Sequence, residues 1–236
     1  MSDFKVCHGV ALLAMIAQVE RPIGMFDSGF GGLTVARAVI DLLPSEDLIY
    51  IGDTARYPYG PKPASEVRSY AIELATSLVR DFNAKLIVVA CNSAASVALS
   101  ELRSLFSVPV IGVVEPGARA LVEATTNNRV AVIGTVGTIS SGAYESAVAN
   151  ASRDVSREVS LTATACPGFV EFVERNETSG LAVTELAEKL LGPIRTADVD
   201  TLLLGCTHYP YLSEVIGRVI FLPTQLRPNQ KFRCAQ

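Results

Sequence analysis

Two cysteines, Cys91 and Cys206, each follow an uninterrupted apolar run and are followed at once by polar residues. Cys91 lies in "VVACNSAAS" (88–96) and Cys206 lies in "LLLGCTHYP" (202–210). A cysteine beside a core strand is often simply packed there, because cysteine is among the most buried residue types. The polar residues that follow also favour catalysis, since the start of a helix stabilises a thiolate.

A pair of thiols on opposite sides of one carbon atom can invert a stereocentre. One thiolate removes a proton from one face, and the opposite thiol donates a proton to the other face. The unperturbed pKa of a thiol is about 8.5, so a modest shift makes either form available near neutral pH. His208, two residues after Cys206, could assist such a proton transfer.

The other cysteine chemistries fit the sequence less well. Five cysteines at wide spacing, with no C-x-x-C pair, indicate reduced thiols in a cytoplasm rather than a disulfide framework. Zinc ligands could come from Cys166, Cys206 and His208, but a second closely spaced pair is missing. We therefore expect no metal site and a cytoplasmic location.

The glycine-rich segment "DSGFGG" (27–32) first suggests a dinucleotide site. In the dinucleotide-binding motif G-x-G-x-x-G, Thr34 stands where the third glycine belongs. Asp27 would also place a negative charge near a pyrophosphate. A tight turn that exposes Asp27 and Ser28 is the simpler interpretation. A pyridoxal enzyme needs a lysine in its active site, and no lysine follows a predicted strand where the ligand would bind. We therefore expect no cofactor.

These residues lie on a chain in which short apolar strands alternate with helical stretches. This alternation predicts a mostly parallel sheet that is covered on both faces. The expected strands are 23–26, 48–52, 86–90, 110–114, 129–134, 159–165 and 200–205. Helical patterns cover 33–44, 65–82 and 179–194, with Ser65 and Ser179 as candidate N-caps.

Polar clusters follow four of the expected strands, and this places the site in the fold. In open α/β sheets ligands bind beyond the carboxyl ends of the strands. The segment 113–120 is a candidate crossover into a second α/β unit. We therefore predict an α/β protein of two doubly wound, mostly parallel-sheet domains, with the active site in the cleft between them. The expected bounds are 1–20 for an N-terminal extension, 21–114 for the first domain, completed by 211–236, and 115–210 for the second.

Composition excludes two classes of partner. The formal net charge is −4, which argues against a surface built for phosphate backbones. The apolar run 10–17 is far too short to span a membrane. We expect a small-molecule ligand, with no nucleic acid as main ligand and no membrane partner.

Six motifs, in order along residues 22–220, resemble the glutamate racemases of the aspartate/glutamate racemase superfamily. They are "PIGMFDSGFGGLTV", "IYIGDTARYPYGPK", "VVACNSAAS", "VIGTVGTISSGAY", "ACPGFVEFVE" and "LLGCTHYP". The histidine in "GCTHYP" favours the glutamate enzymes, because an acidic residue usually takes its place in aspartate racemases.

The resemblance implies cofactor-independent interconversion of L- and D-glutamate, which supplies D-glutamate for peptidoglycan. It implies that Cys91 takes the proton from D-glutamate and Cys206 takes it from L-glutamate, and that Asp27, His208 and Glu174 assist the two thiols. The positions that match substrate contacts of the family are Asp27, Ser28, Tyr59, Gly60, Asn92, Ser93, Thr207 and His208. Family members commonly dimerise, so a homodimer is expected.

The chain departs from the family pattern in two places. Ser93 replaces a more usual threonine and retains the hydroxyl group. The tail 221–236 does not resemble the strand, loop and helix that close the first domain of the family. Two alternatives therefore remain: a racemase of another small diacid such as aspartate, and a glutamate-binding relative that is catalytically impaired by its altered C-terminus.

Overall fold

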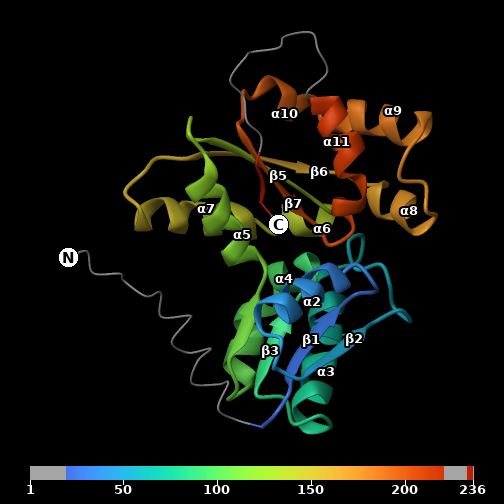
Figure 1. Cartoon of the computed structure of the whole chain (residues 1–236), viewed down its shortest axis with the longest axis vertical. Coiled ribbons are helices and arrows are strands. Elements are labelled where there is room, and N and C mark those ends of the chain that lie inside the picture. The colour runs from blue at the N-terminus through green and yellow to red at the C-terminus, as the bar shows by residue number, and fades with distance from the viewer. Residues whose placement is uncertain (1–19, 221–232, 236) are drawn as a thin grey trace.

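The protein contains two parallel β-sheets, one in each half of the molecule (Figure 1). The structure is a computed structural model, and it describes residues 20–220 and 233–235. The strand order is β2-β1-β3-β4 in the first sheet and β6-β5-β7-β8 in the second. The strands are β1 Ile23–Asp27, β2 Leu48–Gly52, β3 Leu86–Val89, β4 Val110–Gly112, β5 Arg129–Gly134, β6 Ser160–Ala165, β7 Thr201–Gly205 and β8 Arg233–Ala235. The predicted α/β class with parallel sheets is confirmed.

Helices connect the strands and cover the sheets, as a parallel sheet requires. They are α2 Leu33–Leu42, α3 Ala64–Arg80, α4 Asn92–Leu105, α5 Val114–Ala124, α6 Val136–Ser140, α7 Ala143–Asp154, α8 Phe169–Glu174, α9 Leu181–Leu190, α10 Gly192–Thr196, the 3-10 helix η1 Tyr209–Leu212 and α11 Ser213–Ile220. All expected strands form, with ends within two residues of the prediction.

The two predicted N-caps are wrong. Ser65 is the second residue of α3, because the helix begins at Ala64 after Pro63 in an extended conformation. The N-cap of α9 is Gly180 rather than Ser179. Gly180 has a φ of 104°, a conformation that glycine adopts far more readily than serine.

Side chains that alternate along β3 pack on opposite faces of the first sheet. Ile87 and Val89 lie in the cluster that includes Leu102 of α4, whereas Val88 lies in a smaller cluster with Ala36 of α2. A strand buried on both faces must be apolar throughout, which explains the continuous apolar run before Cys91.

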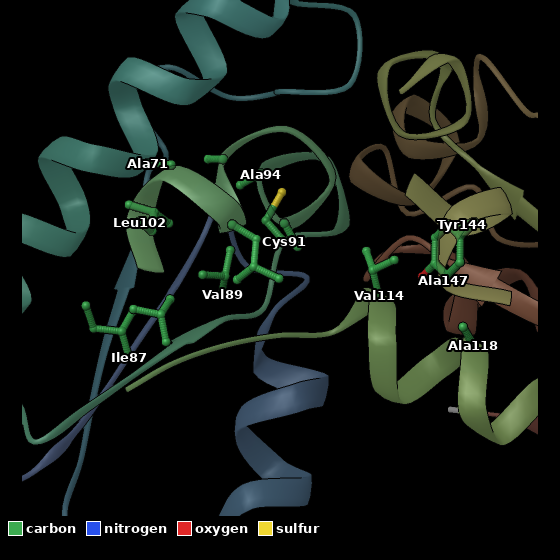
Figure 2. Packing of buried hydrophobic residues seen from close by; sticks show 14 of the residues in the cluster. Ala71, Ile87, Val89, Cys91, Ala94, Leu102, Val114, Ala118, Tyr144 and Ala147 are labelled. Carbon is green, nitrogen blue, oxygen red and sulfur yellow. The ribbon is translucent and has the colours of Figure 1, made fainter. Parts of the chain in front are cut away.

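One large apolar cluster continues from the first half into the second (Figure 2). It joins Val89 and Leu102 of the first half to Val114, Ala118 and Tyr144 of α5 and α7. The two sheets are thus held by a shared core, and the polar ends of their strands are brought to one place between them.

The described part of the C-terminal region lies with the second sheet. Helix α11 contacts α9 and η1, and β8 pairs in parallel with β7. The expectation is that 211–236 completes the first domain. The observed position of β8 differs, because β8 finds its backbone hydrogen-bond partners on β7 of the second sheet. The bounds 21–114 and 115–210 stay a prediction. Residues 1–19 of the expected extension lie outside the described residues, as do 221–232 and 236 of the tail.

Candidate active site

Both halves use the same strand order around their polar ends. In each sheet the first strand along the chain, β1 or β5, lies between the second and third. The chain therefore runs from the first strand to one side of the sheet and later returns to the other side. The place where this direction reverses, between β1 and β3 or between β5 and β7, is called a switch point, and open α/β sheets bind ligands there. Cys91 follows β3 and Cys206 follows β7, so each thiol lies at the switch point of its sheet.

The two thiols line one cleft. Cys91 is the N-cap residue of α4, and Cys206 precedes the turn that leads into η1. Both side chains are buried, and the space in the cleft around them, including its open mouth, is about 280 Å³. Its remaining lining residues are Ser28, Tyr57, Pro58, Tyr59, Gly60, Asn92, Ser93, Thr135, Val170, Thr207 and His208. The cleft thus collects residues from both halves of the molecule.

Burial makes both thiols weak acids. Burial, followed by the charge of Asp27, raises the pKa of Cys91 to about 11. Hydrogen bonds from the backbone N–H of Ala94 and the Ser28 hydroxyl oppose this rise. Burial also raises the pKa of Cys206 far above its usual value, although the backbone N–H of His208 opposes it. The Cys91 thiol donates to Ser28 Oγ at 3.6 Å, whereas Cys206 Sγ lies 3.9 Å from His208 Nδ1.

Asp27 is fully buried at the end of β1. Its carboxylate accepts hydrogen bonds from the Gly29 N–H at 3.0 Å and from the Thr207 hydroxyl at 3.4 Å. Burial raises the pKa of Asp27, while the Gly29 N–H and then His208 oppose the rise. A Cβ at Gly32 would lie 2.5 Å from the Asp27 Cβ, so the glycine-rich turn is required for this arrangement.

His208 connects a carboxylate to the second thiol. Its Nε2 lies 2.6 Å from Glu174 Oε1, at the end of α8, and its Nδ1 faces Cys206 and the Thr207 hydroxyl. With Nε2–H donating to Glu174, Nδ1 is free to act as an acceptor toward the thiol. The predicted residues Asp27, His208 and Glu174 are therefore brought together beside Cys206.

The predicted binding residues Ser28, Tyr59, Gly60, Asn92, Ser93 and Thr207 all line the cleft. Tyr59 presents its ring, because its hydroxyl donates to Asp53 at 2.5 Å. The Gly60 carbonyl accepts from the Gly137 N–H at 3.0 Å, which links the loop after Tyr57 to the start of α6 in the other half. The family resemblance identified this set, and the fold brings it to one cleft.

Sequence reasoning missed several residues of the cleft. Thr135 and Thr138 form a buried hydroxyl cluster with Ser93, at distances of 3.0 to 3.2 Å. Thr135 directly follows β5 and caps α6, so the strand-end rule that found Cys91 could have found it. Tyr57 stacks on His208 with 6.1 Å between ring centroids, and no local pattern signals that contact.

Among residues 20–220 and 233–235, no group of three or more His, Cys, Asp and Glu side chains could hold a metal ion. In the same part of the chain no helix combines the length and the apolar character that crossing a membrane requires.

The family model described as Asp/Glu/Hydantoin racemase matches residues 33–226. This match covers most of the chain, and racemases act at a stereocentre, the chemistry expected of two thiols that line one cleft. The chain belongs to the Asp/Glu/Hydantoin racemase family, a family of isomerases.

The similar proteins narrow this class to glutamate racemases. A glutamate racemase from Parafrankia sp. (strain EAN1pec) is 54% identical over 199 residues, which are 84% of this chain and 70% of that protein. The structure of a glutamate racemase isoform from Bacillus anthracis is similar with a TM-score of 0.81 and 39% identity, covering 92% of this chain and 77% of that chain. A glutamate racemase from Francisella tularensis, solved in complex with D-glutamate, gives a TM-score of 0.77 at 36% identity, covering 84% and 73%. The resemblance inferred from the six motifs is confirmed.

Proposed function

We propose that the chain interconverts L- and D-glutamate by moving the Cα proton between Cys91 and Cys206. The observation that carries this proposal is the pair of buried thiols, one from each half, lining the same cleft at equivalent strand ends. Solved relatives are described as complexes with D-glutamate and L-glutamate, which supports glutamate as the substrate.

The proposed reaction swaps the protonation states of the two thiols. The thiolate on one side takes the Cα proton and becomes a thiol, leaving a carbanion. The thiol on the other side then donates its proton to the opposite face of Cα and becomes a thiolate. Following the family, Cys91 removes the proton of D-glutamate and Cys206 removes that of L-glutamate.

The raised thiol pKa values support this chemistry. A Cα proton is very weakly acidic, and a thiolate with a high pKa is a stronger base toward it than an ordinary thiolate. Exclusion of water from the cleft keeps that basicity, because the thiolate is not stabilised by hydration. The positive ammonium group of a bound amino acid would stabilise the thiolate at the moment it is needed.

We assign assisting roles to the three groups beside the thiols. His208, oriented by Glu174, can accept or return the proton of Cys206 across 3.9 Å. Asp27 can attract the substrate ammonium group through its charge, because its buried carboxylate accepts from the hydroxyl of Thr207, which lines the cleft.

Hydroxyl, amide and backbone groups are suited to the two carboxylates of glutamate. Ser28, Asn92, Ser93 and Thr207 line the cleft and can donate hydrogen bonds to carboxylate oxygens. The ring of Tyr59 and the backbone of Gly60 complete the wall on the side of the first half.

The wider biological role follows from the reaction. D-glutamate made by this chain would supply peptidoglycan synthesis. The described cysteines Cys91, Cys166 and Cys206 are free thiols, which suits a reducing cytoplasm. A homodimer is proposed from the family resemblance alone.

Incubation with L-glutamate in D2O, without added cofactor, tests the reaction. We expect D-glutamate to form with deuterium at Cα. Turnover of aspartate in preference to glutamate would favour the diacid alternative. Calorimetric binding of glutamate without exchange or inversion would favour an impaired binding protein.

Serine variants test the two-thiol mechanism. Cys91→Ser and Cys206→Ser should each reduce racemisation by about 10²- to 10⁴-fold, the usual contribution of a general acid or base. Cys166→Ser is the matched control, because this third buried thiol does not line the cleft with the other two. Full activity in either cleft variant would refute the mechanism.

A further inference from the structure

Tyr144 makes a contact that reaches from the second half into the active site. It is the second residue of α7 and is almost fully buried. Its hydroxyl lies 2.5 Å from Oδ1 of Asn92, the first residue of α4 and a lining residue of the cleft. Figure 2 shows Tyr144 beside Val114 and Ala147, with Cys91 at the start of α4 on the other side.

The hydrogen bond defines which end of the Asn92 amide faces the cleft. Burial raises the pKa of Tyr144 far above its usual value, so the phenol stays protonated and donates. Asn92 Oδ1 is therefore occupied as the acceptor. Among residues 20–220 and 233–235 the Asn92 amide nitrogen makes no hydrogen bond to the protein.

The opposite amide orientation is disfavoured on two counts. It would leave the buried Tyr144 hydroxyl without its acceptor, and an unpaired buried donor is unfavourable. It would also turn the amide oxygen toward the cleft, where it would repel a bound carboxylate. The Tyr144 hydroxyl thus determines whether Asn92 offers the cleft a hydrogen-bond donor, its NH2 group, or an acceptor, its amide oxygen.

We propose that Tyr144 is a positioning residue, whose hydroxyl holds the Asn92 amide with its NH2 group directed at a carboxylate of the bound amino acid. This inference rests on the proposed function, because it requires a carboxylate substrate in the cleft. Tyr144 acts through Asn92 and touches neither thiol by a hydrogen bond in the described residues. It contributes to substrate binding rather than to proton transfer.

The variant Tyr144→Phe tests the inference, since it removes the hydroxyl and keeps the ring in the core. We expect KM for L-glutamate to rise by about 10- to 150-fold, the range for a lost hydrogen bond to a charged group, with kcat changed less than about threefold. Asn92→Ala should raise KM by at least as much. The double variant should be no worse than Asn92→Ala alone, because Tyr144 has nothing left to orient.

Tyr209→Phe is the matched control for loss of a buried tyrosine hydroxyl. Tyr209 donates to the Cys166 carbonyl oxygen at 3.0 Å, and within the described part of the chain its hydroxyl makes no hydrogen bond to Asn92. Its effect should multiply with that of Asn92→Ala. Two results would overturn the inference. One is an unchanged KM in Tyr144→Phe, and the other is an effect of Tyr144→Phe on KM that multiplies with the effect of Asn92→Ala. Melting temperatures of all variants show that each is folded.

The wild type separates this inference from the proposed function. Glutamate binding without turnover would refute the proposed function, and the same cycle measured on calorimetric Kd values would then decide the role of Tyr144. Absence of both binding and turnover would overturn both.

Discussion

At the residue scale, Cys91 and Cys206 are the same side chain in different surroundings. Cys91 contacts the Ser28 hydroxyl, whereas Cys206 lies beside the His208 ring, which is in turn bound to Glu174. In the proposed mechanism the two acids exchange roles, and they need not be identical in the free protein. L- and D-glutamate have the same free energy, so any difference between the thiols must cancel over the complete reaction.

Cys91 should be protonated in the free enzyme at neutral pH. Burial and the Asp27 carboxylate raise its pKa to about 11, so about one molecule in a thousand carries the Cys91 thiolate at pH 8. The thiolate absorbance of the wild type minus that of Cys91→Ser should stay near zero up to about pH 9 and rise above about pH 10. Cys166, whose pKa burial raises to about 12, is the control and should titrate later. A Cys91 thiolate signal at pH 7 would contradict this.

Removing the charge of Glu174 should slow the enzyme modestly. Glu174→Gln keeps an oxygen that can accept from His208 Nε2 but removes the negative charge beside the ring. We expect kcat to fall by about three- to tenfold, because a charge-assisted hydrogen bond is roughly twice as strong as a neutral one. Glu177→Gln, on an exposed residue paired with Arg175, should leave kcat unchanged. Equal kcat values for both variants would argue against a role of Glu174 in turnover.

The candidate site was predictable where chemistry depends on neighbours in sequence. Cys91, Cys206 and His208 follow apolar strands, and that local pattern alone marks them. Glu174 could be assigned only through the family resemblance, because its partner His208 is 34 positions away. The Tyr144–Asn92 contact joins residues 52 positions apart and leaves no local pattern at either.

At the element scale, the loop between β2 and α3 connects the two halves beside the cleft. Gly60 lies in this loop, and its carbonyl accepts from the Gly137 N–H of α6. A Cβ at Gly60 would lie 2.8 Å from the Cβ of Thr135. Because Cβ atoms move only with the backbone, the loop or the helix would have to shift.

Gly60→Ala should therefore harm both binding and stability. We expect kcat/KM to fall by about tenfold or more and the melting temperature to drop, because overpacking costs about 1–3 kcal/mol. Gly217→Ala, in α11 with open space around the added methyl group, should instead stabilise the protein by about 0.5–1 kcal/mol. Matched stability changes of the same sign in the two variants would contradict the steric argument.

The elements themselves were more predictable than their ends. Strands β1 to β7 form where continuous apolar runs lie between turn residues, because burial on both faces leaves no polar position in them. The helix caps were not predictable from serine alone, since Gly180 adopts a backbone conformation that sequence does not display.

At the scale of the whole molecule, the two sheets repeat one strand order without a recognisable sequence repeat. Strand order is a tertiary property, so the sequence predicted the parallel sheets but not the equivalent positions of the two thiols at their switch points. The placement of β8 beside β7 was also not predictable, because nearly thirty residues separate these strands along the chain.

Asp200 ties the second half together at the end of the sheet away from the thiols. It precedes β7, and its carboxylate accepts hydrogen bonds from the Thr125 hydroxyl at 2.6 Å and from the N–H groups of Thr126 and Asn127 at 2.7 and 2.9 Å. The turn between α5 and β5 is therefore anchored to the start of β7 by one ionised side chain.

Loss of the Asp200 charge should destabilise the fold only where the carboxylate is ionised. Burial alone would raise the pKa of Asp200, but the hydrogen bonds from Thr125, Thr126 and Asn127 outweigh it and lower the pKa to about 2. A lowered pKa in the folded state gives stability that is present above the unfolded value of 3.8 and disappears as pH falls toward 2.

Asp200→Asn should cost about 1–2 kcal/mol at pH 7, after allowance for solvent screening, and little near pH 2. Unfolding in urea at pH 7 and at pH 2.5 measures this difference, with Asp198→Asn, at a half-exposed residue, as the control that should change stability by less than about 1 kcal/mol. A loss of stability in Asp200→Asn that is equal at both pH values would show that the anchor works through shape rather than through charge.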